Sequence, residues 1–165
     1  MTQGLTYEIL KFEIDLVPSY WDKPPSTKIL INNEEKYSGF VTENIKVKFE
    51  HKLEFNKNHT LTIVRSNKTD DQVKTVDNIR YDQSLEIEKL KIDGINCKGL
   101  MNRYSYTIFE YPEAYKKDQK EKGIDLPHSV PAATLMAHNG IWDFNFSSPF
   151  YIFIMKWMGG GVYSE

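Results

Sequence analysis

The chain has 165 residues and a net charge of −2, from 21 basic and 23 acidic side chains. This near balance argues against nucleic acid and acidic membranes as partners, because neither would meet an extended positive field. A single cysteine, Cys97, excludes an intramolecular disulfide. The length suits one domain that buries a substantial core.

A two-residue apolar period predicts strands in the first half of the chain. Residues 10–16 alternate apolar with charged side chains, and residues 45–55 repeat the pattern with Lys and Glu outward. A strand places alternate residues on one face, whereas a helix would scatter them around its axis. Pro18, Pro24 and Pro25 predict an irregular loop after the first strand.

A later strand carries a fault in its alternation. Leu85 and Ile87 share one parity, whereas Leu90 and Ile92 share the other. One extra residue near Lys89 would restore the apolar face, which predicts a β-bulge or a bend between two sheets.

One helix and one hairpin are predicted in the second half of the chain. Residues 113–123 are charged and end at Gly123, which favours a short surface helix. Asn139 and Gly140 separate two apolar segments and predict a hairpin turn.

The last apolar segment, residues 150–157, is apolar at both parities. We expect a strand that is covered on both faces. The cover would be another part of the chain, such as residues 112–135, or a partner subunit.

These patterns favour an all-β fold, an antiparallel β-sandwich of jelly-roll type with one short surface helix. We expect residues 1–158 to form a single domain and residues 159–165 to be a flexible Gly-rich tail.

An aspartate-rich stretch between two predicted strands has two interpretations. Asp70, Asp71, Asp77 and Asp82 would make a calcium site if the loop folded back on itself, because Ca²⁺ takes six to eight oxygen ligands. The spacing of an EF-hand is absent, and the same residues also begin turns and solvate a crossover. Calcium is the one cofactor that we consider.

Catalytic motifs give little support for an enzyme. Glu86 and Glu88 share a strand face, and glycoside hydrolysis needs two carboxylates. That face is opposite the apolar one, where solvent-exposed charges belong. We therefore expect no enzymatic activity, and a polysaccharide hydrolase is the least favoured alternative.

Aromatic side chains are the remaining candidates for binding. Tyr20 and Trp21 lie in a proline-stiffened loop, and sugar rings stack on such side chains. A Trp in this loop also suits a core or an interface. The predicted binding residues are Tyr20, Trp21, Trp142, Phe153 and Trp157.

Four features together resemble small β-sandwich proteins of tailed bacteriophages, which are similar to jelly-roll carbohydrate-binding modules. They are the LTI strand, the crossover through Asp70 and Asp71, the IEKLKIDGI strand and the WDFNFSSP entry to the last apolar segment. The resemblance implies a binding or assembly role in a neck, collar, capsid decoration or fibre attachment, and no reaction.

We therefore predict a phage virion structural or accessory protein that acts by subunit packing. Its expected partners are other virion proteins and further copies of itself, as a homo-oligomer. Its expected location is the virion, after synthesis in the host cytoplasm without a signal peptide. The alternative is a glycan-binding module, with Tyr20, Trp21 and the Asp70–Asp82 loop near the sugar.

Overall fold

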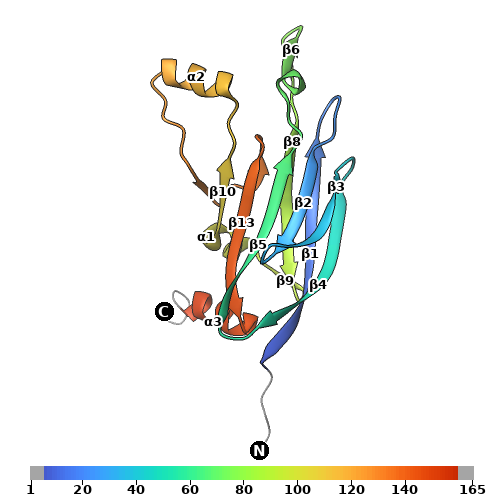
Figure 1. The fold of residues 1–165 in the computed structure, drawn as a ribbon, viewed down its shortest axis with the longest axis vertical. Helices are drawn as coiled ribbons and strands as arrows, with labels where there is room; N and C mark the ends of the chain where they lie inside the picture. Colours follow the sequence, from blue (N-terminus) through green and yellow to red (C-terminus); the bar gives the residue numbers. More distant parts are fainter. Residues whose placement is uncertain (1–5, 160–165) are drawn as a thin grey trace, which may run out of the picture.

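Two antiparallel sheets face each other in the computed structural model, which describes residues 6–159 (Figure 1). Sheet A contains β1 (Tyr7–Ser19), β4 (Ile45–Glu54), β8 (Ser84–Ile92), β9 (Ile95–Asn96) and β12 (Leu135–Met136). Sheet B contains β2 (Ser26–Ile31), β3 (Glu34–Phe40), β5 (Lys57–Ser66), β10 (Ser105–Phe109), β11 (Val130–Pro131) and β13 (Gly140–Ser148). The predicted all-β, antiparallel sandwich of jelly-roll type is confirmed.

The core lies between the inward faces of the two sheets. Apolar residues at alternate positions of β1, from Leu10 to Leu16, are at most 1% exposed. From sheet B they meet Trp142, Phe144 and Phe146 of β13, which are at most 2% exposed. Each such side chain contributes about 1.5–3 kcal/mol on burial, which is why the two-residue period determines the strands.

The predicted bulge is confirmed in β8. Asp15 of β1 pairs with Lys89, but the next residue, Leu16, pairs with Ile87. Glu88 is therefore the extra residue. The bulge keeps the apolar side chains on both sides of it inside the core.

The predicted hairpin at Asn139 and Gly140 is wrong. The strand before it, β12, pairs with β8 in sheet A, whereas β13 pairs with β10 and β5 in sheet B. The segment therefore crosses from one sheet to the other. A Cβ atom on Gly140 would lie 2.6 Å from the backbone oxygen of Ile108, so a close backbone approach explains this glycine.

The last apolar segment is also not the predicted strand. It forms α3 (Phe150–Gly159), a helix that closes one end of the sandwich (Figure 1). Glu8 of β1 accepts a hydrogen bond from the Phe150 backbone N–H at 2.7 Å and another from the Ser148 hydroxyl. A carboxylate at a helix N-terminus satisfies free N–H groups and stabilises the helix dipole.

A helical period explains which side chains of α3 are covered. Phe150 is buried, and Phe153, Ile154 and Trp157 pack against the core at intervals of three and four residues. The opposite side exposes Tyr151, Ile152 and Met155. A segment that is apolar at both parities fits a strand and a helix equally, so its composition alone led to the wrong strand prediction.

Two further helices lie outside the sheets. The predicted surface helix is confirmed as α2 (Glu113–Glu121), and Gly123 follows it with a φ of 73°. The other helix, α1 (Lys98–Tyr104), links β9 to β10. None of the helices between residues 6 and 159 is long and apolar enough to cross a membrane. Apart from Gly159, the predicted tail lies outside the described residues.

Substituting the two first residues of α3 tests its orientation. Phe150→Ala should lower the free energy of unfolding by about 3–5 kcal/mol, because it leaves a cavity in the core. Tyr151→Ala, at a side chain that is 62% exposed, should change it by about 0.5 kcal/mol or less. Urea unfolding followed by tryptophan fluorescence measures both values. Similar large losses in both variants would contradict the helix.

Candidate functional site

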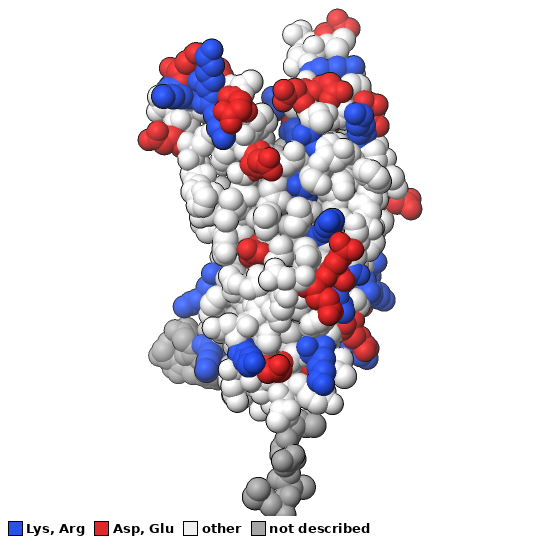
Figure 2. Space-filling view, in the orientation of Figure 1, with Lys and Arg blue, Asp and Glu red and all other residues white. Residues whose placement is uncertain are grey.

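A cleft of about 670 Å³ opens at the end of the sandwich opposite α3. On one side lies α2, and on the other lies the hairpin of β6 (Lys74–Val76) and β7 (Ile79–Tyr81). Both project beyond the sheets, and Figure 2 shows the hollow between them. Charged side chains gather on both projections.

Buried glutamines fix the hairpin side of the cleft. Gln72, in the short helix η1 (Asp70–Gln72), accepts hydrogen bonds from the Trp21 indole at 2.8 Å and the Lys23 backbone N–H at 3.0 Å. The Gln83 amide donates to the Lys23 carbonyl at 2.7 Å. Both glutamines are fully buried, so the proline-rich loop and the base of the hairpin are held together.

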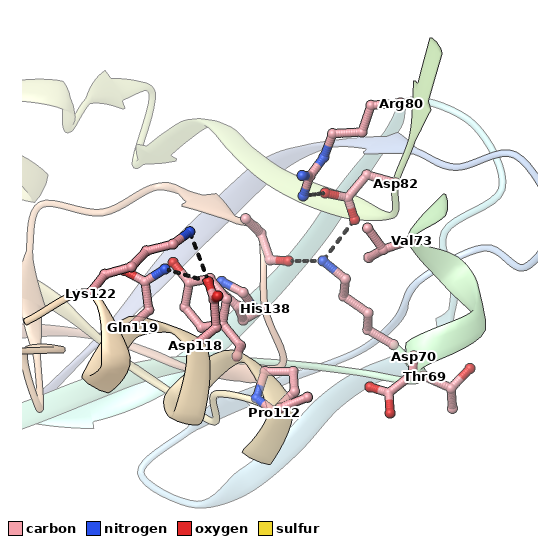
Figure 3. A pocket seen from close by; sticks show the side chains of 14 residues that line it. Thr69, Asp70, Val73, Arg80, Asp82, Pro112, Asp118, Gln119, Lys122 and His138 are labelled. Atoms are coloured by element: carbon pink, nitrogen blue, oxygen red, sulfur yellow. Dashed lines mark hydrogen bonds and ion pairs between the residues drawn. The ribbon is translucent and has the colours of Figure 1, made fainter. Parts of the chain in front are cut away.

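Asp82 is the centre of a charge network in the cleft (Figure 3). Its carboxylate lies 2.7 Å from the Lys68 ammonium and 3.1 Å from the Arg80 guanidinium. Lys68 also donates to the Ala137 carbonyl at 2.5 Å. Burial opposes ionisation of Asp82, but hydrogen bonds from Lys68, Gln83 and Arg80 outweigh it and lower its pKa below 3.8.

Aromatic rings form the neighbouring part of the cleft wall. The His138 ring lies 4.9 Å from that of Tyr115 and 5.2 Å from that of Tyr111, between ring centroids. Burial, followed by the charge of Lys68, lowers the pKa of His138 below 6.5. At neutral pH this ring is therefore an uncharged aromatic surface beside Tyr115 of α2.

The charges that line the cleft balance one another. Its basic side chains are Lys68, Arg80 and Lys122, and its acidic side chains are Asp70, Asp82 and Asp118. The Lys122 ammonium lies 3.0 Å from the carboxylate of Asp118, which belongs to α2. Figure 3 shows this ion pair. The cleft thus offers paired hydrogen-bonding groups beside aromatic rings, a combination suited to a neutral polar molecule with one apolar face.

The two loop aromatics predicted to bind a ligand lie outside this lining. The Lys74 ammonium is 3.9 Å from the centroid of the Trp21 ring, and Tyr81 packs against it edge-on at 6.0 Å. The Tyr20 hydroxyl donates to the Thr42 carbonyl at 2.9 Å. Trp21 therefore supports the hairpin side of the cleft and does not contribute a cleft surface.

The other three predicted binding residues lie in the core or pack against it. Trp142 is fully buried, so its prediction as a binding residue is corrected: an inward position of β13 leaves no contact with a ligand. Trp157 packs against the core close to Gly99. Phe153 also packs there, but it lines a second groove as well.

The predicted aspartate site for calcium does not form. Among the described residues, no group of three or more His, Cys, Asp or Glu side chains could hold a metal ion. Asp71 accepts a hydrogen bond from the Thr69 hydroxyl, Asp77 sits in the hairpin turn with a φ of 51°, and Asp82 is engaged by basic side chains. These residues do not fit a calcium site.

The carboxylate pair considered for hydrolysis does not line the cleft either. Glu86 and Glu88 are exposed on the outer face of sheet A. Neither is among the described residues that line the cleft.

Sequence reasoning missed Tyr115, His138 and Lys68 as a group. The helix that carries Tyr115 was predicted. Tyr115 is the one aromatic residue of that charged helix, and this was the signal in the sequence for a role in binding. The approach of His138 depends on the crossing between the sheets, which was predicted as a hairpin.

No family model matches the chain, and no curated protein matches it. Among solved structures, the carbohydrate-binding module vCBM60 in complex with galactobiose is similar, with 7% identity and a TM-score of 0.47 over 82% of this chain and 98% of that chain. A selenomethionine form of vCBM60, described among calcium-dependent carbohydrate-binding modules, has 6% identity and a TM-score of 0.48, covering 82% and 89%. Because both TM-scores are below 0.5, function must be inferred from the residues of this chain.

Asp82→Asn tests the charge network through the dependence of stability on pH. The folded-state pKa of Asp82 is lowered, so its charge stabilises the fold above pH 4 and that contribution is lost as the pH falls through the folded-state pKa. We expect a loss of about 1–3 kcal/mol at pH 7, because the ammonium of Lys68 is left without its carboxylate. Thermal unfolding from pH 7 to pH 2 measures the difference, which should shrink below pH 4. A difference that stays constant would contradict this role.

Proposed function

We propose that the protein is a non-catalytic glycan-binding module whose ligand occupies the cleft between α2 and the β6–β7 hairpin. The observation that carries this proposal is the arrangement of Tyr115 and His138 beside the network of Lys68, Asp82 and Arg80. Stacking surfaces and charged hydrogen-bonding groups meet in one concave site.

The two kinds of wall match the two kinds of surface on a sugar. The C–H face of a pyranose ring is apolar and packs on an aromatic ring. Its hydroxyl groups donate to carboxylates such as Asp82 and accept from cations such as Arg80, and hydrogen bonds to charged groups are stronger than those between neutral groups. Asp118 and Gln119 of α2 add a carboxylate and an amide on the opposite wall.

The ion pairs of the cleft favour a neutral glycan over an anionic ligand. Lys68 and Arg80 already face Asp82, and Lys122 faces Asp118. An anion would have to displace a carboxylate from the ammonium or guanidinium group that it faces. A neutral polyhydroxylated ligand can join these pairs without separating them.

Subunit assembly is the second candidate, supported by the exposed apolar side of α3. Tyr151 and Met155 are 62% and 52% exposed, which is high for large apolar side chains. This observation favours packing against another chain. A virion location and virion partners rest on the sequence resemblance alone and stay predictions.

Tyr115→Ala should reduce glycan affinity at least about tenfold, because it removes a stacking surface of the cleft. Wild-type protein is first tested on an array of neutral glycans, and the strongest signal is quantified by isothermal titration calorimetry. Tyr20→Ala is the matched control, since it removes a partly exposed tyrosine ring outside the cleft lining.

The two variants separate the possible sites. Loss of binding in Tyr20→Ala with full binding in Tyr115→Ala would place the ligand at the proline-rich loop and contradict the cleft. Wild-type protein that binds no glycan on the array would contradict the function itself.

A further inference from the structure

A second groove, of about 320 Å³, lies beside the outer face of sheet B near α3. Its lining includes Tyr104, Phe153, Asn58, Asn145 and Ser147. We propose that this groove is a second subsite for the same neutral glycan chain whose other part occupies the cleft. This inference rests on the proposed function and extends it to the length of the ligand.

The strand register brings the polar groups of the groove together. Ser147 of β13 pairs with Asn58 of β5, and one repeat along the strand Asn145 pairs with Thr60. Buried Phe144 and Phe146 alternate with these residues, so the side chains of Asn145 and Ser147 face outward from the sandwich.

Two aromatic rings complete the groove. The centroids of the Tyr104 and Phe153 rings are 4.8 Å apart, and the planes are tilted by 52°. Tyr104 ends α1 and Phe153 belongs to α3, so two helices place an aromatic surface beside the amides of the sheet. The predicted role of Phe153 in binding would be fulfilled here.

The chemistry of the groove favours a neutral polyhydroxylated occupant. None of the described residues that line it carries a charge. The Thr60 hydroxyl donates to Asn145 Oδ1 at 2.9 Å, which turns the NH₂ group of that amide away from Thr60. An amide donor beside aromatic rings repeats the combination of groups found in the cleft.

The outward positions of β13 run from the groove towards the cleft through Asn145, Asp143 and the exposed Ile141. Asp143, one repeat from Asn145 on β13, accepts hydrogen bonds from Thr62 at 2.6 Å and Tyr106 at 3.4 Å on the neighbouring strands. At the usual rise per residue of a strand, β13 spans roughly 17 Å between Gly140, two residues after His138, and Asn145 in the groove. A ligand that reaches both sites must therefore be an oligosaccharide of several residues.

Chain length is the variable that tests this proposal. Wild-type protein is titrated calorimetrically with cello-, xylo- and galacto-oligosaccharides, each from the disaccharide to long oligomers. We expect the best series to gain at least about tenfold in affinity with length, since the second contact becomes intramolecular. Asn145→Ala should remove this gain and leave disaccharide affinity unchanged, whereas Tyr115→Ala should weaken every length.

Control variants separate loss of a subsite from loss of fold. Lys28→Ala changes an exposed residue at an outward position of β2 in the same sheet and should bind as the wild type does. Tyr104→Ala should reproduce Asn145→Ala, with its circular dichroism spectrum checked first because Tyr104 also packs against the core.

The outcomes distinguish this subsite from the proposed function. Affinity that is independent of length and unchanged in Asn145→Ala, but reduced in Tyr115→Ala, overturns the subsite and leaves the function standing. Long oligomers that depend on Asn145 but not on Tyr115 overturn the shared ligand. Absence of binding to all three series and to the glycan array overturns both.

Discussion

A buried guanidinium holds together the end of the sandwich that carries the cleft. Arg65, at the end of β5, is fully buried and donates at 2.7 Å to the side chain of Asn139 and at 2.7 Å to the backbone carbonyl of Gln83. Burial lowers its pKa to about 10, with Asp82 opposing the shift, so the charge persists at neutral pH. A buried charge that is shielded from water is stable only while its hydrogen-bond partners stay in place. Arg65 therefore holds β5 together with the two segments that carry Asn139 and Gln83.

Asn139 transmits this constraint to the cleft. Its amide donates to the Lys68 carbonyl at 3.0 Å, and its Oδ1 accepts from the Lys68 backbone N–H at 3.0 Å. The backbone of Lys68 is thereby fixed, and its ammonium lies against Asp82 and the Ala137 carbonyl. The stability of this end of the sandwich and the geometry of the cleft consequently depend on the same hydrogen bonds.

The sequence predicted those parts of the fold in which one face of an element is buried and the other is exposed to solvent. Residues 10–16 and 45–55, and the bulge in β8, have that property, so their periods were unambiguous. Residues 150–157 do not, because apolar side chains occupy every position but one, and Lys156 alone could not select a helix over a strand. Trp142 shows the same limit for binding residues, since an aromatic ring suits a core and a ligand equally.

The site was less predictable than the fold because it is made by the ends of elements that meet only in space. The strand β13 and the segments joined to it contribute residues to both the cleft and the groove. The link before β13 carries His138 and Asn139, its outward positions carry Asp143 and Asn145, and the helix after it carries Phe153. Core packing of its inward aromatic residues fixes the register of this strand. Burial of Trp142 makes it unavailable to a ligand. Because the same burial fixes the register of β13, it also determines the positions of the polar groups on the outward face of this strand.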